Sequence, residues 1–259
     1  MDLSTKELKE LQQIIEPIIL TAGIRILSSW TKIQSIRYKD KRDVVTNVDI
    51  EVENYIRSEL TKIFPDAGFY VEEGITDTKA KYNWAIDPID GTKYYAHLLP
   101  FFVTQIALLE NNVPILGIVL NPVTNQLFSA SRGNGTVFNG QVMLSKARSR
   151  IEESVIDLDF GGPDEEIDQK TRLFNKLAKH FYRVRIFGGT MVSYIVTGAI
   201  DAYLVPNRAN KIVDIAPNII ILKEAGLTVD SIDVPHYRPL LCAANKELFN
   251  QVKKLLVEV

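Results

Sequence analysis

The sequence predicts a mixed α/β protein with an α+β N-terminal half and an α/β C-terminal half. Two patterns predict this class. Helix-spaced apolar residues give way after about residue 65 to short apolar segments divided by turn residues, which is typical of a meandering, mostly antiparallel sheet. Beyond residue 150, strand-like and helix-like segments alternate, which is typical of layered α/β structure. No linker-like segment separates residues 1–150 from 151–259, so we expect the halves to pack as one unit.

The N-terminal half begins with two predicted helices. A capping-box pattern and apolar residues at helical spacing predict an amphipathic helix over residues 5–29, with a kink at Pro17. The basic stretch 35–42 shows no regular pattern and is predicted to be irregular. A second helical pattern begins at Thr46, which places Asp49 in its first turn.

Short strands dominate the rest of the first half, because turn signals recur between the apolar segments. We expect these strands over residues 69–71, 84–86, 103–109, 115–120 and 126–130. The second half is expected to contain strands 154–158, 184–187 and 202–205, helices near 165–181, 214–225 and from 245, and a short helix after Gly189.

Composition excludes several classes of protein. The 259 residues include 30 basic and 32 acidic side chains, and a net charge of −2 is unlike that of a nucleic-acid binder. The longest clean apolar stretch, 113–120, is too short to span a membrane, and no secretory signal is visible. Cys242 is the one cysteine, so the fold needs no disulfide and a cytoplasmic location is expected. A small-molecule partner fits these properties best.

The densest chemical signal is Asp87-Pro-Ile-Asp90-Gly-Thr92, which follows an apolar strand. Pro88 disfavours helical backbone at Asp87, so both carboxylates should be held near one point. Like charges this close cost free energy unless a cation lies between them, and oxygen ligands suit Mg²⁺. Taken alone, the same residues could also be ordinary turn and cap residues.

Further motifs make the chain resemble the inositol monophosphatase family of Mg²⁺-dependent, lithium-sensitive phosphatases. The stretch 43–49, Asp-Val-Val-Thr-Asn-Val-Asp, is similar to the family's Asp-x-Val-Thr-x-x-Asp, and Glu72-Glu73-Gly74 is similar to its Gly-Glu-Glu segment, with Val71 in place of the glycine. The stretch 213–217, Val-Asp-Ile-Ala-Pro, keeps the Asp and Ala of the family's second motif but lacks its Trp. The resemblance runs in order from about residue 40 to 255. It implies a layered α-β-α-β-α sandwich of the sugar phosphatase type.

The resemblance also implies two or three Mg²⁺ ions per active site. Glu72, Asp87 and the carbonyl of Ile89 would hold the first ion, and Asp87, Asp90 and Asp214 would hold the second. A third, weaker ion would bind through Glu72 and waters. A pair of such ions can activate a water and stabilise the leaving oxygen of a phosphate ester.

The resemblance gives catalytic roles to Thr92, Asp49 and Glu72. A hydrogen bond between Thr92 and Asp49 would position and deprotonate the attacking water. Asp90, Gly91 and Thr92 would bind the substrate phosphate, and Gly91 lets the backbone approach it closely. Asp49 could instead only complement the helix dipole.

Substrate selection is expected from the C-terminal loops, where Gly189, Thr190, Arg208 and Lys211 would face the substrate. Animal inositol phosphatases carry a Glu where this chain has Val205. The basic residues are closer to archaeal-type members, which act on both inositol phosphates and fructose 1,6-bisphosphate, and could bind a second phosphate. They could equally be solvated loop charges.

Two other functions remain open. Lys93 after Gly91-Thr92 is similar to the branch acting on 3′-phosphoadenosine 5′-phosphate, whose adenine could stack on Tyr94 or Tyr95. A non-catalytic regulatory member of the fold is the alternative of another class. The resemblance implies a homodimer or homotetramer, with no nucleic acid polymer and no membrane as partner.

Overall fold

The computed structural model describes residues 2–32, 36–38, 44–78, 81–143, 148–161, 166–206, 212–234 and 238–257. The chain divides into two compact units, each with its own sheet and core. The first comprises residues 1–142 and 211–224, and the second comprises 143–210 and 225–259. These units differ from the expected halves chiefly in helix α5 (Ile212–Glu224), which belongs to the first unit.

The first unit is built on a seven-stranded sheet in the order β3-β4-β5-β6-β7-β8-β9. Strand β3 runs parallel to β4, and the successive pairs from β4 to β8 are antiparallel, as a meander requires. The elements besides α5 are α1 (Thr5–Trp30), β1 (Ile36–Tyr38), β2 (Val44–Thr46), α2 (Asn47–Ile63), β3 (Gly68–Val71), β4 (Tyr82–Asp90), α3 (Thr92–Ala96), β5 (Val103–Glu110), β6 (Val113–Asn121), β7 (Gln126–Ser131), β8 (Thr136–Phe138) and β9 (Gln141–Met143).

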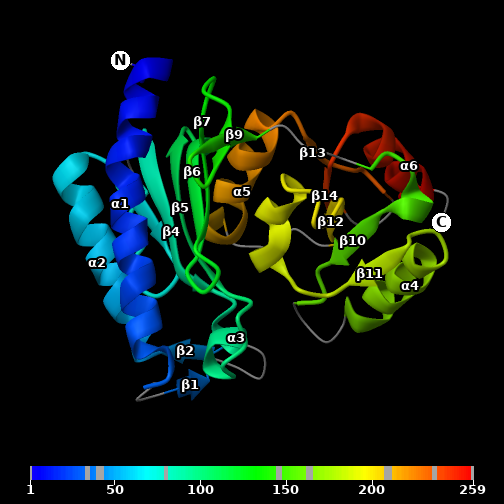
Figure 1. Cartoon of the computed structure of the whole chain (residues 1–259), viewed down its shortest axis with the longest axis horizontal. Helices are drawn as coiled ribbons and strands as arrows, with labels where there is room; N and C mark the ends of the chain where they lie inside the picture. Colours follow the sequence, from blue (N-terminus) through cyan, green and yellow to red (C-terminus); the bar gives the residue numbers. More distant parts are fainter. Residues whose placement is uncertain are drawn as a thin grey trace. The chain divides into compact units, whose positions relative to one another are not determined.

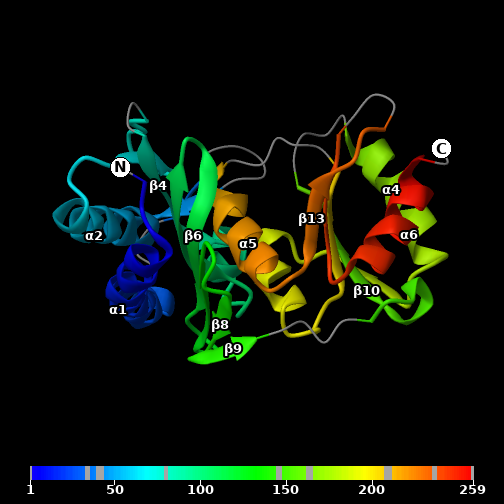
Figure 2. The same cartoon turned by 90° about the horizontal axis from the view of Figure 1, so that it is seen from above.

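Helices cover both faces of this sheet. Figures 1 and 2 show α1 and α2 on one face and α5 on the other. Side chains alternate along β4, so Trp84 and Ile86 join the core beneath α1 and α2, while Ala85 packs with Val213 of α5. Asp87 follows Ala85 by two residues and therefore lies on the α5 face of the sheet.

Helix α5 approaches this face closely because the sheet presents small residues to it. Ala85 and Ala107 pack against it, and a Cβ added to Gly117 would lie 2.5 Å from the carbonyl oxygen of Pro217. No side chain fits in that space without moving the backbone of α5. The close approach brings the first turn of α5 to the strands that carry the acidic motif.

Helix α1 is continuous from Thr5 to Trp30 and includes Pro17. Its N-terminus has the expected capping box, in which the Ser4 amide donates to the Glu7 carboxylate at 2.8 Å. By length and composition alone α1 is long and apolar enough to cross a membrane, although it contains no uninterrupted apolar stretch of that length. Of its most apolar window, 39% is buried within the protein. Leu8 and Ile15 lie in the core of the first unit, whereas Ile14 and Ile24 are exposed.

The second unit contains a five-stranded sheet in the order β11-β10-β12-β14-β13, with β10 parallel to both of its neighbours. Helices α4 and α6 lie together on one face of it (Figure 2), where they form a single apolar core with the strands. Its elements are η1 (Ile151–Glu153), β10 (Val155–Leu158), α4 (Ile167–Ala178), β11 (Arg183–Arg185), η3 (Gly189–Ile195), β12 (Ala202–Val205), β13 (Thr228–Ser231), β14 (Leu240–Ala243) and α6 (Lys246–Val257).

The predicted mixed α/β class is confirmed, while several local expectations differ. Strand β1 lies in the stretch 35–42 that was expected to be irregular, and it pairs with β2; residues 35 and 39–42 of that stretch lie outside the described part. The helix after Gly189 is a 3₁₀ helix. Strands β8, β9, β13 and β14 were also not foreseen, because strands of three or four residues carry little periodicity of their own, although the equally short β3, β10, β11 and β12 overlap strands that were expected.

Candidate active site

The acidic motif lies at the C-terminal end of β4. Pairing with β5 continues to Asp87, shifts, and resumes at Asp90, so Pro88 and Ile89 form an irregularity inside the strand. The strand expected over residues 84–86 is therefore longer in the structure, where β4 continues through the motif to Asp90. Gly91 then turns the chain into α3 with a φ of 90°, a left-handed conformation that favours glycine.

The carboxyl group of Asp87 lies close to those of Glu72, Asp90 and Asp214. This side chain is buried, and its pKa is raised well above the usual value by burial and by the charges of Glu72, Asp90 and Asp214. These groups come from β4, from the segment after β3 and from the first turn of α5. Within the described residues, Oδ1 of Asp87 has no hydrogen-bond partner. A buried, unpaired acceptor among like charges is a place that favours a cation.

Asp49 and Thr92 form the hydrogen bond that the family resemblance implies. The Thr92 hydroxyl lies 3.1 Å from Oδ1 of Asp49 and 2.8 Å from the carbonyl oxygen of Ile89. A hydroxyl has one proton, so it can donate to only one of these acceptors at a time. Oδ2 of Asp49 accepts from the Thr46 amide at 2.9 Å, which fixes the carboxyl group. Burial raises the pKa of Asp49 to about 6, against the lowering effect of the bonds from Thr46 and Thr92.

The loop that carries Glu72 is held by Glu53, a residue that was not predicted to belong to the site. Glu53 of α2 is buried at 3% exposure, and its carboxylate accepts from the Glu73 amide at 2.8 Å and from the amides of Glu72 and Gly74. Burial raises the pKa of Glu53, while these amide bonds lower it. The only sequence signal is its position four residues after Asp49, on the buried face of α2. That signal is shared by many core residues.

Replacing Glu53 with Gln should displace the loop that carries Glu72. One carboxylate oxygen becomes a donor facing backbone amides, and leaving buried donors unsatisfied costs about 1–3 kcal/mol. Thermal unfolding should show this loss, and the Mg²⁺ concentration for half-maximal activity should rise roughly 10-fold or more. Glu51→Gln is the control, because Glu51 is exposed and its pairing with Arg25 contributes little. Unchanged Mg²⁺ dependence in a folded Glu53→Gln variant would contradict this role.

Gln105 and Asn218 were also missed. Gln105 lies directly opposite Asp87 in the β4–β5 register and contacts Asp87 and Asp90, while Asn218 lies on α5 and contacts Gln105. Both amides are buried. Neither belongs to a motif, and nothing local distinguishes a core amide from an exposed one. Only the pairing of β5 with β4 and α5 brings them to the carboxyl cluster.

The donors around Asp87 fit a divalent cation of the Mg²⁺ type. All are carboxylate or carbonyl oxygens, which Mg²⁺ prefers, and Mg²⁺ commonly binds through one or two carboxylates and several waters. Within the described residues, no group of three or more Asp, Glu, His or Cys side chains could hold a metal ion in its present arrangement. The carboxyl groups are thus near one another without converging on one point, and a cation would have to draw them together.

The remaining predicted residues belong to other parts of the chain. Gly189 and Thr190 begin η3 in the second unit, where the Thr190 hydroxyl is buried and has no partner within the described residues. Arg208 and Lys211 lie outside the described residues. Their expected roles in binding substrate remain predictions.

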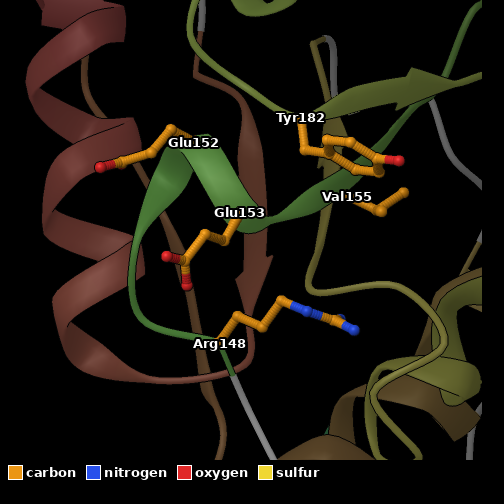
Figure 3. A pocket seen from close by; sticks show the side chains of 5 residues that line it. All are labelled: Arg148, Glu152, Glu153, Val155 and Tyr182. Carbon is orange, nitrogen blue, oxygen red and sulfur yellow. The ribbon is translucent and has the colours of Figure 1, made fainter.

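A cavity of about 310 Å³ in the second unit contains none of the predicted site residues. Figure 3 shows the side chains that line it: Arg148, Glu152, Glu153, Val155 and Tyr182. Its charged groups are already paired. Arg148 lies 3.2 Å from Asp201, and both glutamates pair with Arg150. Charges already compensated within the protein are poor ligand anchors, so we assign no function to this cavity.

Comparisons with known sequences and structures agree on one protein family. A profile of the inositol monophosphatase family matches residues 7–256. The chain is 33% identical over 212 residues to a fructose-1,6-bisphosphatase/inositol-1-monophosphatase from Thermotoga maritima, covering 81% of this chain and 80% of that protein. It is 30% identical over 212 residues to the Nus factor SuhB of Xylella fastidiosa, covering 80% and 76%.

Solved structures agree with the sequence comparison. An IMPase from Thermotoga maritima superposes with a TM-score of 0.84 at 29% identity, covering 96% of this chain and 97% of that one. The extragenic suppressor protein SuhB from Bartonella henselae superposes with a TM-score of 0.87 at 25% identity, covering 95% and 98%. The profile spans almost the whole chain, and the fold matches over the same length. The chain therefore belongs to the inositol monophosphatase family, a family of phosphatases.

Proposed function

We propose that this protein is a Mg²⁺-dependent phosphomonoesterase that acts on inositol monophosphate, fructose 1,6-bisphosphate or both. The observation that carries the proposal is the carboxyl cluster of Glu72, Asp87, Asp90 and Asp214 within one unit that also holds the Thr92–Asp49 hydrogen bond. The name of the Thermotoga maritima relative supports both substrates.

The charge of the cluster argues for a cation. Four carboxyl groups would repel a phosphate ester, and burial together with their mutual repulsion raises the pKa of Asp87. Glu72, Asp87, Asp90, Asp214 and the Ile89 carbonyl would hold two or three Mg²⁺ ions. When bound, such ions offset this repulsion, lower the pKa of a water molecule and stabilise negative charge on the leaving oxygen.

The chain's own groups would orient and deprotonate the attacking water. When the Thr92 hydroxyl donates to Asp49 rather than to the Ile89 carbonyl, its lone pairs can accept a proton from water. The Asp49 carboxyl then takes up the proton of the Thr92 hydroxyl. With a pKa of about 6, Asp49 is a better proton acceptor near neutral pH than an exposed aspartate. The Thr46 amide holds it in place during the transfer.

The structure weakens the argument that the substrate is 3′-phosphoadenosine 5′-phosphate, which rested partly on stacking of an adenine on Tyr94 or Tyr95. Tyr95 is fully buried, its ring packs on Phe102 at 5.1 Å, and its hydroxyl donates to the Ile26 carbonyl. It therefore cannot stack on an adenine without leaving the core. Tyr94 packs edge-on against Phe101 at 5.9 Å, and it is half-buried. A phosphatase acting on 3′-phosphoadenosine 5′-phosphate remains a weaker candidate.

The direct test is phosphate release from inositol 1-phosphate, fructose 1,6-bisphosphate and 3′-phosphoadenosine 5′-phosphate. We expect turnover of one or both of the first two with Mg²⁺, none with EDTA, and inhibition by lithium. Activity that survives EDTA would refute the proposed chemistry. Preference for the nucleotide would retain the chemistry and change the substrate.

A regulatory, non-catalytic role is the competing function, because two similar proteins are named Nus factor SuhB. The presence of every expected carboxylate and of Thr92 favours an enzyme. A folded, Mg²⁺-binding protein that releases no phosphate from any of the three substrates would favour the regulatory role. The same preparation would test the proposed homodimer or homotetramer. Its single, buried cysteine is compatible with the proposed cytoplasmic location.

A further inference from the structure

The amide of Gln105 lies against three acidic residues at once. Gln105 is fully buried in β5, and its Nε2 lies 3.3 Å from Oδ2 of Asp87, 3.2 Å from Oδ2 of Asp90 and 3.2 Å from the carbonyl oxygen of Asp214. Because Gln105 is directly opposite Asp87 in an antiparallel pair, both side chains lie on the α5 face of the sheet.

Asn218 determines which end of this amide faces the carboxylates. It lies one turn after Asp214 in α5 and is 2% exposed. Its Nδ2 donates to Oε1 of Gln105 at 3.1 Å and to the Asp214 carbonyl at 3.3 Å. If the Gln105 amide were flipped, an NH₂ group would face Asn218 and an oxygen would face two carboxylates. The observed orientation is therefore the favourable one.

These contacts involve only one oxygen of Asp87, and the carboxyl group of Glu72 also interacts with this side chain. Gln105 contacts Oδ2, whereas Oδ1 is buried and has no hydrogen-bond partner within the described residues. A carboxylate has enough lone pairs to accept from an amide on one oxygen and bind a cation through the other. A neutral donor also offsets carboxylate repulsion without a positive charge that would compete with the cation.

The contacts are weak enough to allow adjustment. An NH₂ group has two hydrogens for three acceptors, and distances of 3.2–3.3 Å are longer than the 2.7–2.9 Å usual for strong charge-assisted bonds. The Gln105 amide thus holds the carboxylates of Asp87 and Asp90 by weak hydrogen bonds, and these carboxylates can still move towards a cation.

We propose that Gln105 and Asn218 form a positioning pair that holds Asp87, Asp90 and the first turn of α5 ready for a divalent cation. This inference rests on the proposed function, since it assumes that the carboxyl cluster binds such a cation. Groups that hydrogen-bond to metal ligands typically change metal affinity 10- to 100-fold when they are removed. The pair would therefore act on cation affinity, with no contact to the substrate.

The test is direct binding of Mn²⁺ to the full chain without substrate, measured by the electron paramagnetic resonance signal of free Mn²⁺. Gln105→Met keeps the length of the side chain and removes the donor, and we expect its Mn²⁺ affinity to fall 10- to 100-fold. Its Mg²⁺ requirement should rise by a similar factor, while the substrate KM at saturating Mg²⁺ stays unchanged. Asn218→Leu, which frees the Gln105 amide, should weaken Mn²⁺ binding less.

Thr104→Val is the matched control. Thr104 neighbours Gln105 in β5, is fully buried, and its hydroxyl has no partner within the described residues. Its replacement by an isosteric residue should leave Mn²⁺ affinity unchanged. If Gln105→Met does not fold, Gln105→Asn keeps the amide and withdraws it by one carbon, and it should also weaken binding.

Two failures can be told apart. Unchanged or tighter Mn²⁺ binding in a folded Gln105 variant would overturn this inference, while an active, Mn²⁺-binding wild-type protein would leave the proposed function intact. A wild-type protein that binds no Mn²⁺ would overturn both. A raised substrate KM at saturating Mg²⁺, with Mn²⁺ affinity unchanged, would place Gln105 in substrate binding and would also overturn the inference.

Discussion

Replacing Asp87 with Asn is expected to reduce phosphate release at least about 1,000-fold while the protein keeps its fold. Asp87 contributes a buried oxygen that has no hydrogen-bond partner within the described residues, and burial and the charges of Glu72, Asp90 and Asp214 raise its pKa. If Asp87 holds Mg²⁺ as proposed, losing this ligand should remove several kcal/mol of transition-state stabilisation. Asn is almost the same shape, so the packing around β4 should survive.

The stability of the metal-free variant separates this effect from unfolding. Burial and three neighbouring charges make the ionised Asp87 unfavourable in the folded state. In EDTA, Asp87→Asn should therefore unfold at the same temperature as the wild type or higher. Asp66→Asn, at an exposed aspartate of the same unit, should change neither property. Near-normal turnover in Asp87→Asn would remove Asp87 from the mechanism.

The second large effect is expected at Asp157 of β10, which lies in the other unit. Its side chain is fully buried, and Oδ1 accepts from the Phe187 amide at 2.8 Å. Burial, aided by the charge of Asp159, raises the pKa of Asp157 to about 7 despite the amide bonds from Phe187 and Gly188. Oδ2 has no partner within the described residues, so a carboxylate there is poorly compensated.

The sign of the pH dependence follows from proton binding. In the unfolded chain Asp157 loses its proton near pH 4, whereas in the folded protein it keeps the proton to about pH 7. The folded state binds more protons in this window, so the free energy of unfolding falls as the pH rises from 4 to 7. The loss contributed by this group is up to about 4 kcal/mol above pH 7.

Asp157→Asn should remove this dependence. We expect the variant to match the wild type near pH 4 and to be more stable than the wild type at pH 8, as measured by denaturant unfolding at both pH values. Asp230→Asn, at an exposed aspartate of the same unit, is the control. If wild type and Asp157→Asn lost stability in parallel between pH 5 and 8, Asp157 would not be the titrating group.

Local sequence patterns were sufficient for the elements that have strong periodicity or cap residues of their own. The capping box at Ser4, the helix beginning near Thr46 and the apolar strand before Asp87 could all be predicted, because neighbouring residues determine them. The motif around Asp87 and Asp90 also identified the candidate site. Some short strands, among them β8, β9, β13 and β14, were not predicted, because three or four residues carry little periodicity of their own and these strands form by pairing with neighbours in the sheet.

By itself, the amino-acid sequence determined the fold class, the family and most of the candidate carboxylates. The tertiary structure alone decided that α5 belongs with the first unit and that Glu53, Gln105 and Asn218 support the cluster. The reason is physical. Buried amides and carboxylates are defined by partners that long-range strand pairing and close helix packing bring near, and no local pattern records such partners.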